Sequence, residues 1–357
     1  MKRVIRTGGG RLSKREASNL TITVSSLLGS DAALRRAVAA SLGSPSEEEG
    51  LFLYYHASGD NGFILLDENA YPGKIQDVLK IASISDAAVY FLPKDGKLSW
   101  MDGELALMLD FLEISQGKIV ATGDVNSARS VAQKVFKGLT LSSFHVVPSS
   151  DPSLFSSMGG GRSRSKETGG ITYVSVDRAF NVKGVGLIVL GFVVSGSVKT
   201  HDVIRILPQG KEAEVRSIQI MDIDVGSASL GSRVGLCLKG ASVEDFQKGV
   251  GVGSERVKIS HEVTIDFRPS PYFRQGIRKP VDLHVQTLSG LNLGHVAPQL
   301  DGKITVTYQK QVPVWAGQRA VVVDLNIRPG GSRVIGGGVV SAFAEGARSP
   351  SLMPRNS

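Results

Sequence analysis

The stretch "ITVSSLLGSDAALRRAVAASLG", Ile22 to Gly43, has the order of elements found in phosphate-binding loops: an apolar strand, a short loop and an amphipathic helix. Such a loop needs two glycines, because backbone N–H groups must curl around the phosphate oxygens. It then needs a Lys for the phosphate charge and a Ser or Thr for magnesium. This stretch has the order of elements without those residues.

The surrounding sequence indicates an α/β domain over residues 19–155. Apolar strand-like runs alternate there with helical patterns, as in "LTITV" followed by "DAALRRAVAASL" and "GFILLD" followed by "KIQDVLKIA". This alternation predicts a parallel sheet with crossover helices. Residues 1–18 are basic and lack apolar periodicity, which predicts a flexible tail.

The rest of the chain predicts two all-β domains. Residues 156–170, "SSMGGGRSRSKETGG", are rich in Gly, Ser and Arg and indicate a linker. Beyond it, short β-branched runs with Gly turns predict one antiparallel barrel over residues 171–256 and a second over residues 257–345. Residues 346–357 are polar and predict a second flexible tail.

Composition restricts the chemistry and the partners. The 357 residues carry a formal charge of +8 with a pI near 9.5, which favours nucleic acid as a partner ahead of a membrane surface. The single cysteine, Cys237, excludes an internal disulfide and a Cys-based metal cluster. The six histidines have no metal-ligand spacing, and no nucleophile motif is present. The apolar runs are too short to span a bilayer and the N-terminus lacks the apolar segment of a signal peptide, so we expect a cytoplasmic protein.

A series of motifs in register runs from Asp177 to Gly240. They begin with Phe180 and a Gly-x-Gly at Gly184 and Gly186, followed by a strand that opens with Gly196. A Lys-x-x-Asp at Lys199 and Asp202 comes next, and a Gly-x-x-Val-Gly at Gly231, Val234 and Gly235 ends the series. This run resembles domain 2 of the translational GTPases, especially elongation factor Tu, elongation factor 1-alpha and the selenocysteine-specific elongation factor. The later stretch "RPGGSRVIGGGVVSAF" is similar to the closing strand of their domain 3, with Arg333 at its basic position. The resemblance implies a P-loop-GTPase-like parallel sheet followed by two antiparallel β-barrels.

Aligned on this family, the N-terminal domain resembles a GTPase domain whose motifs are lost. Ser25 and Ser30 replace the two glycines, Asp31 replaces the Lys, and Ala32 replaces the magnesium-binding hydroxyl. A carboxylate at Asp31 would repel a triphosphate. We expect Ser30 to cap the following helix, with Asp31 near the positive end of its dipole.

The other nucleotide-binding motifs of the family are altered as well. Gly123, Asp124, Val125 and Asn126 replace the guanine-reading Asn-Lys-x-Asp. Asp67 persists at the end of its strand, and Lys74 stands where a water-positioning His belongs. The resemblance therefore implies a pseudo-GTPase without catalytic residues. No cofactor is expected, since GTP and magnesium would bind only if the divergent loop retained affinity.

In the resembled factors, domain 2 presents a pocket for the aminoacylated 3′ adenosine of tRNA and contacts the small ribosomal subunit. Basic residues replace family positions near that pocket, and Phe180 offers a surface for stacking a base. The candidate RNA-binding residues are Asp177, Arg178, Phe180, Lys183, Gly184, Arg233 and Arg333. The implied partners are tRNA or ribosomal RNA, and the ribosome. Two alternatives remain: an active, divergent GTPase acting in elongation, or a scaffold for a protein partner whose binding is insensitive to salt.

Overall fold

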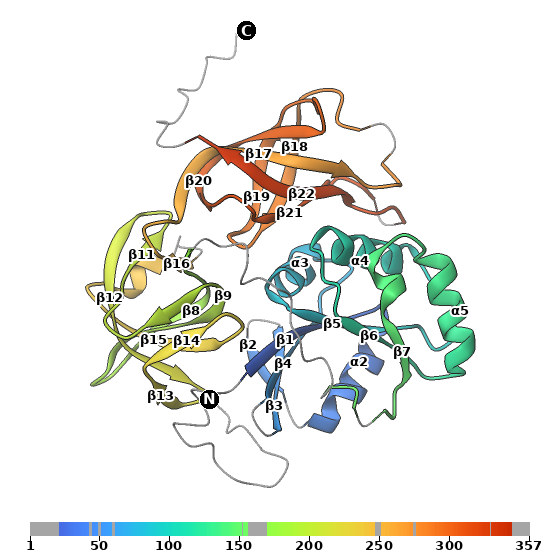
Figure 1. The fold of residues 1–357 in the computed structure, drawn as a ribbon, viewed down its shortest axis with the longest axis horizontal. Helices are drawn as coiled ribbons and strands as arrows, with labels where there is room; N and C mark the ends of the chain where they lie inside the picture. Colours follow the sequence, from blue (N-terminus) through green and yellow to red (C-terminus); the bar gives the residue numbers. More distant parts are fainter. Residues whose placement is uncertain are drawn as a thin grey trace.

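The computed structural model describes residues 21–42, 45–48, 51–58, 61–151, 153–155, 170–246, 251–273, 276–328 and 330–344. The two expected tails and residues 156–169 of the expected linker lie outside these ranges. Figure 1 shows an α/β block drawn in blue to green, a second block in yellow-green and a third in orange to red. This confirms the predicted fold class, an α/β domain followed by two antiparallel β-barrels.

The α/β block is built on a seven-stranded sheet of order β2-β3-β4-β1-β5-β6-β7. Its strands are β1 (Thr21–Leu28), β2 (Ser46–Glu48), β3 (Leu51–Ser58), β4 (Asn61–Glu68), β5 (Ala87–Phe91), β6 (Gly117–Ala121) and β7 (His145–Pro148). The strands from β4 to β7 in this order are parallel. Strands β2 and β3 add two antiparallel pairs that the strand–helix alternation does not predict. Strand β3 ends too close in sequence to β4 for a crossover helix, so the two strands must pair antiparallel.

Helices cover both faces of this sheet. They are α2 (Ala32–Ala39), α3 (Ile75–Ile84), α4 (Trp100–Phe111) and α5 (Val125–Val135), with 3₁₀ turns η1 (Ala40–Leu42) and η2 (Thr140–Ser143). Helix α2 packs on one face, and α3 and α4 pack on the opposite face, toward the all-β blocks (Figure 1). Because α2, α3 and α5 follow β1, β4 and β6, their first turns lie at the carboxyl edge of the sheet, where ligands bind in folds of this kind.

The second block is an antiparallel barrel. Its strands are β8 (Tyr173–Val182), β9 (Gly186–Ser195), β10 (Ser197–Lys199), β11 (Val203–Leu207), β12 (Lys211–Ile220), β13 (Ile223–Val225), β14 (Ser227–Ser229), β15 (Arg233–Lys239) and β16 (Gly251–Gly253), with turn η4 (Val243–Phe246). The strand order is β11-β16-β8-β9-β15-β12-β13, and β11 also pairs with β12, so the run closes on itself. Strands β10 and β14 form a separate pair.

The third block is a closed antiparallel barrel of order β17-β20-β19-β18-β21-β22. Its strands are β17 (Lys258–Pro269), β18 (Val281–Thr287), β19 (Gly290–Val296), β20 (Lys303–Val314), β21 (Arg319–Val323) and β22 (Val334–Phe343). Apolar residues alternate along these strands and fill the interior with a core that belongs to this barrel alone.

A second apolar cluster continues through all three blocks. It joins α3 and α4 to the interior of the second block and to outward-facing residues of the third, and the rings of Tyr173 and Trp315 lie 5.2 Å apart within it. At Gly231, where φ is +85°, a Cβ would stand 2.8 Å from the carbonyl oxygen of Ile22 in β1. Only glycine allows this approach of the second block to the sheet. The three blocks are therefore in direct contact.

No helix in the described ranges is long and apolar enough to cross a membrane.

Candidate functional site

The position expected for a phosphate loop is occupied by continuous strand. Strand β1 runs to Leu28, and Ser25 and Ser26 pair with Ala87 and Ala88 of β5. The side chains of Ser25 and Ser26 are buried. Only residues 29–31 connect this strand to α2. The backbone of residues 25–28 therefore stays in the sheet, whereas a phosphate loop would turn out of the sheet at this point.

Asp31 is the N-cap of α2, and its carboxylate accepts a 2.9 Å hydrogen bond from the backbone N–H of Leu34. The expectation that Ser30 caps the helix is wrong: Ser30 precedes the cap, and Ala32 is the first helical residue. An aspartate satisfies the free N–H groups as well as a serine does and also carries the negative charge that this end of a helix favours. The helix start is thus satisfied by the chain's own carboxylate.

Arg35, one turn further along α2, is directed into the same region. Its side chain is 4% exposed, and its Nε donates a 2.8 Å hydrogen bond to the carboxylate of Asp67 at the end of β4. The guanidinium also donates to the backbone carbonyl of Glu68, at 2.9 Å, and to that of Gly29. One side chain therefore joins the residue after β1 to the last two residues of β4.

Asp67 is fully buried, and a second guanidinium, that of Arg36, lies 3.6 Å from its other oxygen. Burial raises the pKa of Asp67, while the charges of Arg35 and Arg36 act in the opposite direction. Arg36 also lies over the ring of Phe52, 4.8 Å from its centre. This acid is held by two arginines of the same chain.

Among the described residues, Lys74, Gly123 and Asp124, the other positions predicted for the nucleotide site, make no hydrogen bond or ion pair with this cluster. Lys74 precedes α3 with an exposed side chain, and no hydrogen bond from its side chain caps the helix. Gly123 and Asp124 precede α5, where the exposed carboxylate of Asp124 accepts a 2.7 Å hydrogen bond from the N–H of Ser127. Asp124 is a helix cap, which accounts for its position without a base-reading role.

The residues at this edge do not fit GTP and magnesium. In nucleotide-binding domains of this type, magnesium is held by a loop hydroxyl and by the acid at the end of the neighbouring strand. Here the loop hydroxyl is replaced by Ala32, and the acid, Asp67, is already paired with Arg35. Asp31 adds negative charge where a triphosphate would lie. In this region Arg35 provides the positive charge beside Asp67, and Asp31 provides the negative charge at the start of α2.

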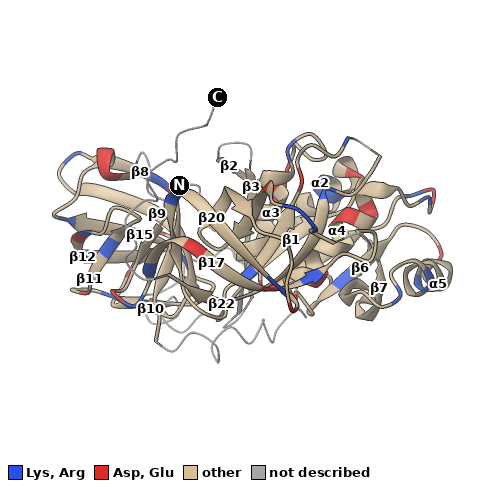
Figure 2. Ribbon diagram, turned by 90° about the horizontal axis from the view of Figure 1, so that it is seen from above, with Lys and Arg blue, Asp and Glu red and all other residues tan. Residues whose placement is uncertain are grey.

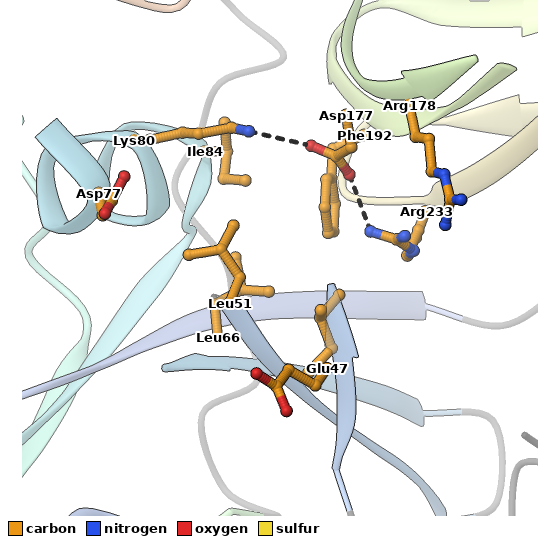
Figure 3. A pocket seen from close by; sticks show the side chains of 11 residues that line it. Glu47, Leu51, Leu66, Asp77, Lys80, Ile84, Asp177, Arg178, Phe192 and Arg233 are labelled. Atoms are coloured by element: carbon orange, nitrogen blue, oxygen red, sulfur yellow. Dashed lines mark hydrogen bonds and ion pairs between the residues drawn. The ribbon is translucent and has the colours of Figure 1, made fainter. Parts of the chain in front are cut away.

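A different region of the molecule does contain a cavity, of about 200 Å³, between the α/β block and the second block (Figure 3). The α/β block contributes β2, β3, β4 and α3, and the second block contributes β8, β9 and β15. Its lining residues are Glu47, Leu51, Leu53, Leu66, Asp77, Lys80, Ile84, Asp177, Arg178, Phe192 and Arg233. The cavity therefore combines apolar side chains with charges of both signs.

Three of the predicted RNA-binding residues meet on the wall of this cavity. Asp177 is 13% exposed and accepts a 2.8 Å hydrogen bond from Arg233, which is 5% exposed. Lys80 of α3 lies 3.6 Å from the other oxygen of Asp177. Arg233 also stacks over Phe192, 5.1 Å from the ring centre, and Arg178 lines the same side of the cavity. Figure 3 shows Asp177 between the two cations.

Three further predicted residues lie along β8 and the turn that follows it. Phe180 is partly exposed, and the exposed Arg178 lies over its ring at 5.4 Å from the centre. Lys183 and Gly184 are exposed in the turn between β8 and β9. A strip of aromatic and basic side chains, Arg178, Phe180 and Lys183, therefore leads away from the cavity. We call it the β8 strip.

Arg333 lies elsewhere. It donates to both oxygens of Glu104 in α4, with Nη2 at 2.6 Å and Nε at 3.1 Å, and also to the carbonyl of Pro72 at 2.8 Å. Burial alone would lower the pKa of Arg333, but the hydrogen bonds and charge of Glu104 raise it. Glu104 is fully buried. The guanidinium of Arg333 joins the third block to the α/β block, so we do not include it in an RNA-binding surface.

The α/β block followed by two antiparallel β-barrels has the domain order of the translational GTPases. Residues 186–250 match the model of elongation factor Tu domain 2. The chain is 26% identical over 286 residues to the uncharacterized protein MJ0325 of Methanocaldococcus jannaschii, covering 79% of this chain and 90% of that protein. It is also 26% identical over 192 residues to the selenocysteine-specific elongation factor of the same organism, covering 48% of this chain and 41% of that factor.

Among solved structures, elongation factor SelB of Methanococcus maripaludis in its apo form has the same fold. The TM-score is 0.75 at 17% identity, covering 92% of this chain and 81% of that one. The chain is thus a relative of the elongation factor Tu and selenocysteine-specific translational GTPases. It spans less than half the length of the curated selenocysteine-specific factor that it matches.

Sequence reasoning missed Arg35 and Lys80, which lie in the "AALRRAVA" and "IQDVLKIASI" helices. One available signal was the acid pair Asp67 and Glu68 directly after the apolar run "FILL" of β4. Two buried carboxylates require cations nearby, and Arg35 and Arg36 are the basic residues on the helix beside them.

Proposed function

We propose that this chain is a translation-factor relative that binds RNA, tRNA or ribosomal RNA, without GTP-driven switching, and that it acts in the cytoplasm. The observation that carries the proposal is the pairing of Arg35 with Asp67 beside a strand that replaces the phosphate loop. The Methanococcus maripaludis factor of the same fold has been solved in complex with the GTP analogue GPPNHP. In this chain Arg35 joins Gly29, after β1, to Asp67 and Glu68 at the end of β4, which supports a site without nucleotide.

The RNA-binding part of the proposal rests on the β8 strip and the cavity beside it. Phe180 provides an aromatic face for a base, and Arg178 and Lys183 provide charge for the phosphate backbone. The formal charge of +8 favours approach of a polyanion. Figure 2 shows basic segments near β8 and along α5, so the charge is not confined to one block.

The test is a gel-shift titration of aminoacylated and deacylated tRNA at low and moderate salt, each with and without GTP and magnesium. We expect binding that weakens with salt and does not change with GTP. A GTP-dependent affinity would show instead that the divergent loop binds nucleotide. Absence of tRNA binding would lead to the same titration with ribosomal subunits, and salt-insensitive binding to a protein would favour a scaffold.

Variants make the test specific. Replacing Arg178 or Lys183 with Ala should weaken RNA binding and lower the dependence of log K on log salt by about 1 per lost phosphate contact. The matched control is Lys134→Ala, an equally exposed lysine on α5 that is remote from the β8 strip. Equal effects at Lys134 and Lys183 would contradict binding at the strip.

A further inference from the structure

We infer that Arg35 acts as an internal replacement for a nucleotide-bound metal: it fixes residues 68–74 and, through them, the docking of the third block. In GTPases, the segment after the acidic strand end is ordered by phosphate and magnesium and released on hydrolysis. In this chain the ordering contacts come from a covalently attached cation. Nothing in the chemistry of this pairing can be hydrolysed or released.

The first link joins Arg35 to the end of β4. Its guanidinium contacts the carboxylate of Asp67 and the carbonyl of Glu68, and it lies 3.7 Å from the Glu68 carboxylate. Both acids are buried. Two buried carboxylates side by side are tolerated only when a cation is held against them, so the position of Arg35 sets the position of this strand end.

The second link orders the segment that follows. The Oε2 of Glu68 accepts hydrogen bonds from the backbone N–H groups of Ala70, at 2.7 Å, and Tyr71, at 2.8 Å. The N–H of Lys74 donates to the carbonyl of Ala70 at 2.9 Å, immediately before α3. The Glu68 side chain thus folds residues 70–74 into a fixed turn, and its own position depends on Arg35.

The third link reaches α4 and the third block. The Tyr71 hydroxyl donates to Glu104 at 3.0 Å, and Arg333 donates to that same carboxylate and to the carbonyl of Pro72. The Arg333 guanidinium also lies 5.7 Å from the ring centres of Tyr71 and Trp100. The relay therefore begins at Arg35 and ends at Arg333, and its middle is the segment that switches in GTPases.

Two further ion pairs hold the same interface, and both have the same polarity. Arg268 pairs with Asp110 at 2.6 Å, and Arg319 pairs with Glu113. In each case the acid belongs to α4 or its C-terminal end, and the arginine belongs to the third barrel. Figure 2 shows the acidic residues of α4 in red. This surface complementarity favours one arrangement of the third block over any other.

The test measures amide hydrogen exchange in the full chain without RNA, so failure of the proposed RNA binding would leave it unaffected. In Arg35→Ala we expect exchange to increase by about tenfold or more both in residues 69–74 and around residues 333–337, because a local opening reports the loss of its ordering contacts. Millimolar magnesium or a low concentration of guanidinium ion should restore protection in this variant, because each can occupy the place beside Asp67. Neither ion should change protection in the wild type.

Two comparisons complete the test. Arg129→Ala, an exposed arginine on α5, is the matched control and should change neither segment. If Arg35→Ala does not fold, Arg35→Lys serves in its place, since it keeps the charge but loses the fork of donors and should give the same pattern with smaller size. Faster exchange in residues 69–74 without any change around 333–337 would overturn the relay. Protection that neither magnesium nor guanidinium restores would overturn the replacement of a metal.

Discussion

Two buried Arg–Asp pairs in this molecule have the same chemistry and different surroundings. Arg35 and Asp67 lie 2.8 Å apart and are closed in by strand ends and a helix turn. Arg233 and Asp177 also lie 2.8 Å apart, but they form one wall of a cavity of about 200 Å³. The charges of the first pair are therefore neutralised by each other inside the fold and are not available to a ligand. Those of the second pair remain beside a space that a ligand could enter.

The largest expected effect is at the closed pair. Replacing Arg35 with Met leaves Asp67 and Glu68 buried without their main cation, and should lower the free energy of unfolding by about 3–5 kcal/mol. Denaturant unfolding of the variant and the wild type measures this difference. The double variant Arg35→Met, Asp67→Leu should recover much of the loss, because it removes the charge of Asp67, while Glu68 keeps the hydrogen bonds from the N–H groups of Ala70 and Tyr71. A double variant as unstable as the single one would contradict this account of the pair.

The open pair should respond less in stability and more in binding. Arg233→Met removes one cation from Asp177, but Lys80 remains 3.6 Å away, so we expect a loss of about 1–3 kcal/mol in the free energy of unfolding. RNA affinity in the gel shift should fall together with it. For Arg35→Met, tested under conditions where it stays folded, RNA affinity should change less than for Arg233→Met. A larger loss of RNA affinity in Arg35→Met than in Arg233→Met would contradict RNA binding beside the Arg233–Asp177 pair.

A smaller effect is expected at Asp31. Replacing it with Ala removes the cap of α2 and should cost about 1 kcal/mol, whereas Asp31→Asn should be nearly neutral because asparagine caps equally well. Thermal or denaturant unfolding checks both. The Asp31→Lys variant should still fail to bind GTP in a calorimetric titration, since Arg35 continues to hold Asp67. GTP binding by that variant would mean that Asp31 alone closes the site.

The smallest effect concerns pH at Asp124. Hydrogen bonds from Ser127 lower the pKa of this carboxyl. A carboxyl whose pKa is lowered on folding stabilises the fold above its unfolded value of about 3.9, and this contribution disappears as pH falls through the lower folded value. The protection factors of the amides along α5, which correct for the slower intrinsic exchange in acid, should therefore fall below about pH 4. In Asp124→Asn that pH dependence should vanish, and a variant that retained it would assign the effect to another group.

Local patterns predicted the elements well, because a strand or helix shows its period in neighbouring residues. The runs "FILLD" and "AAVYF" became β4 and β5, and the motif from Phe180 to Gly235 predicted the second barrel. The roles of Arg35 and Arg333 depend instead on partners distant in sequence. Arg35 has the appearance of a solvated residue on an amphipathic helix until Asp67 is placed beside it. Arg333, in a Gly-rich segment, resembles an exposed basic residue until Glu104 is placed opposite.

The apolar cluster that runs through all three blocks has a consequence for synthesis of the chain. The α/β block is made before the second and third blocks, and domains generally fold as they emerge. The outer faces of α3 and α4, however, belong to the apolar cluster shared with the second and third blocks, and β18 and β19 contact α3 while β21 and β22 contact α4. Until those are made, the nascent α/β block carries an uncovered apolar face of the kind that promotes aggregation. The order of synthesis therefore leaves this apolar face of the growing chain in need of shielding until the third block closes over the α/β block.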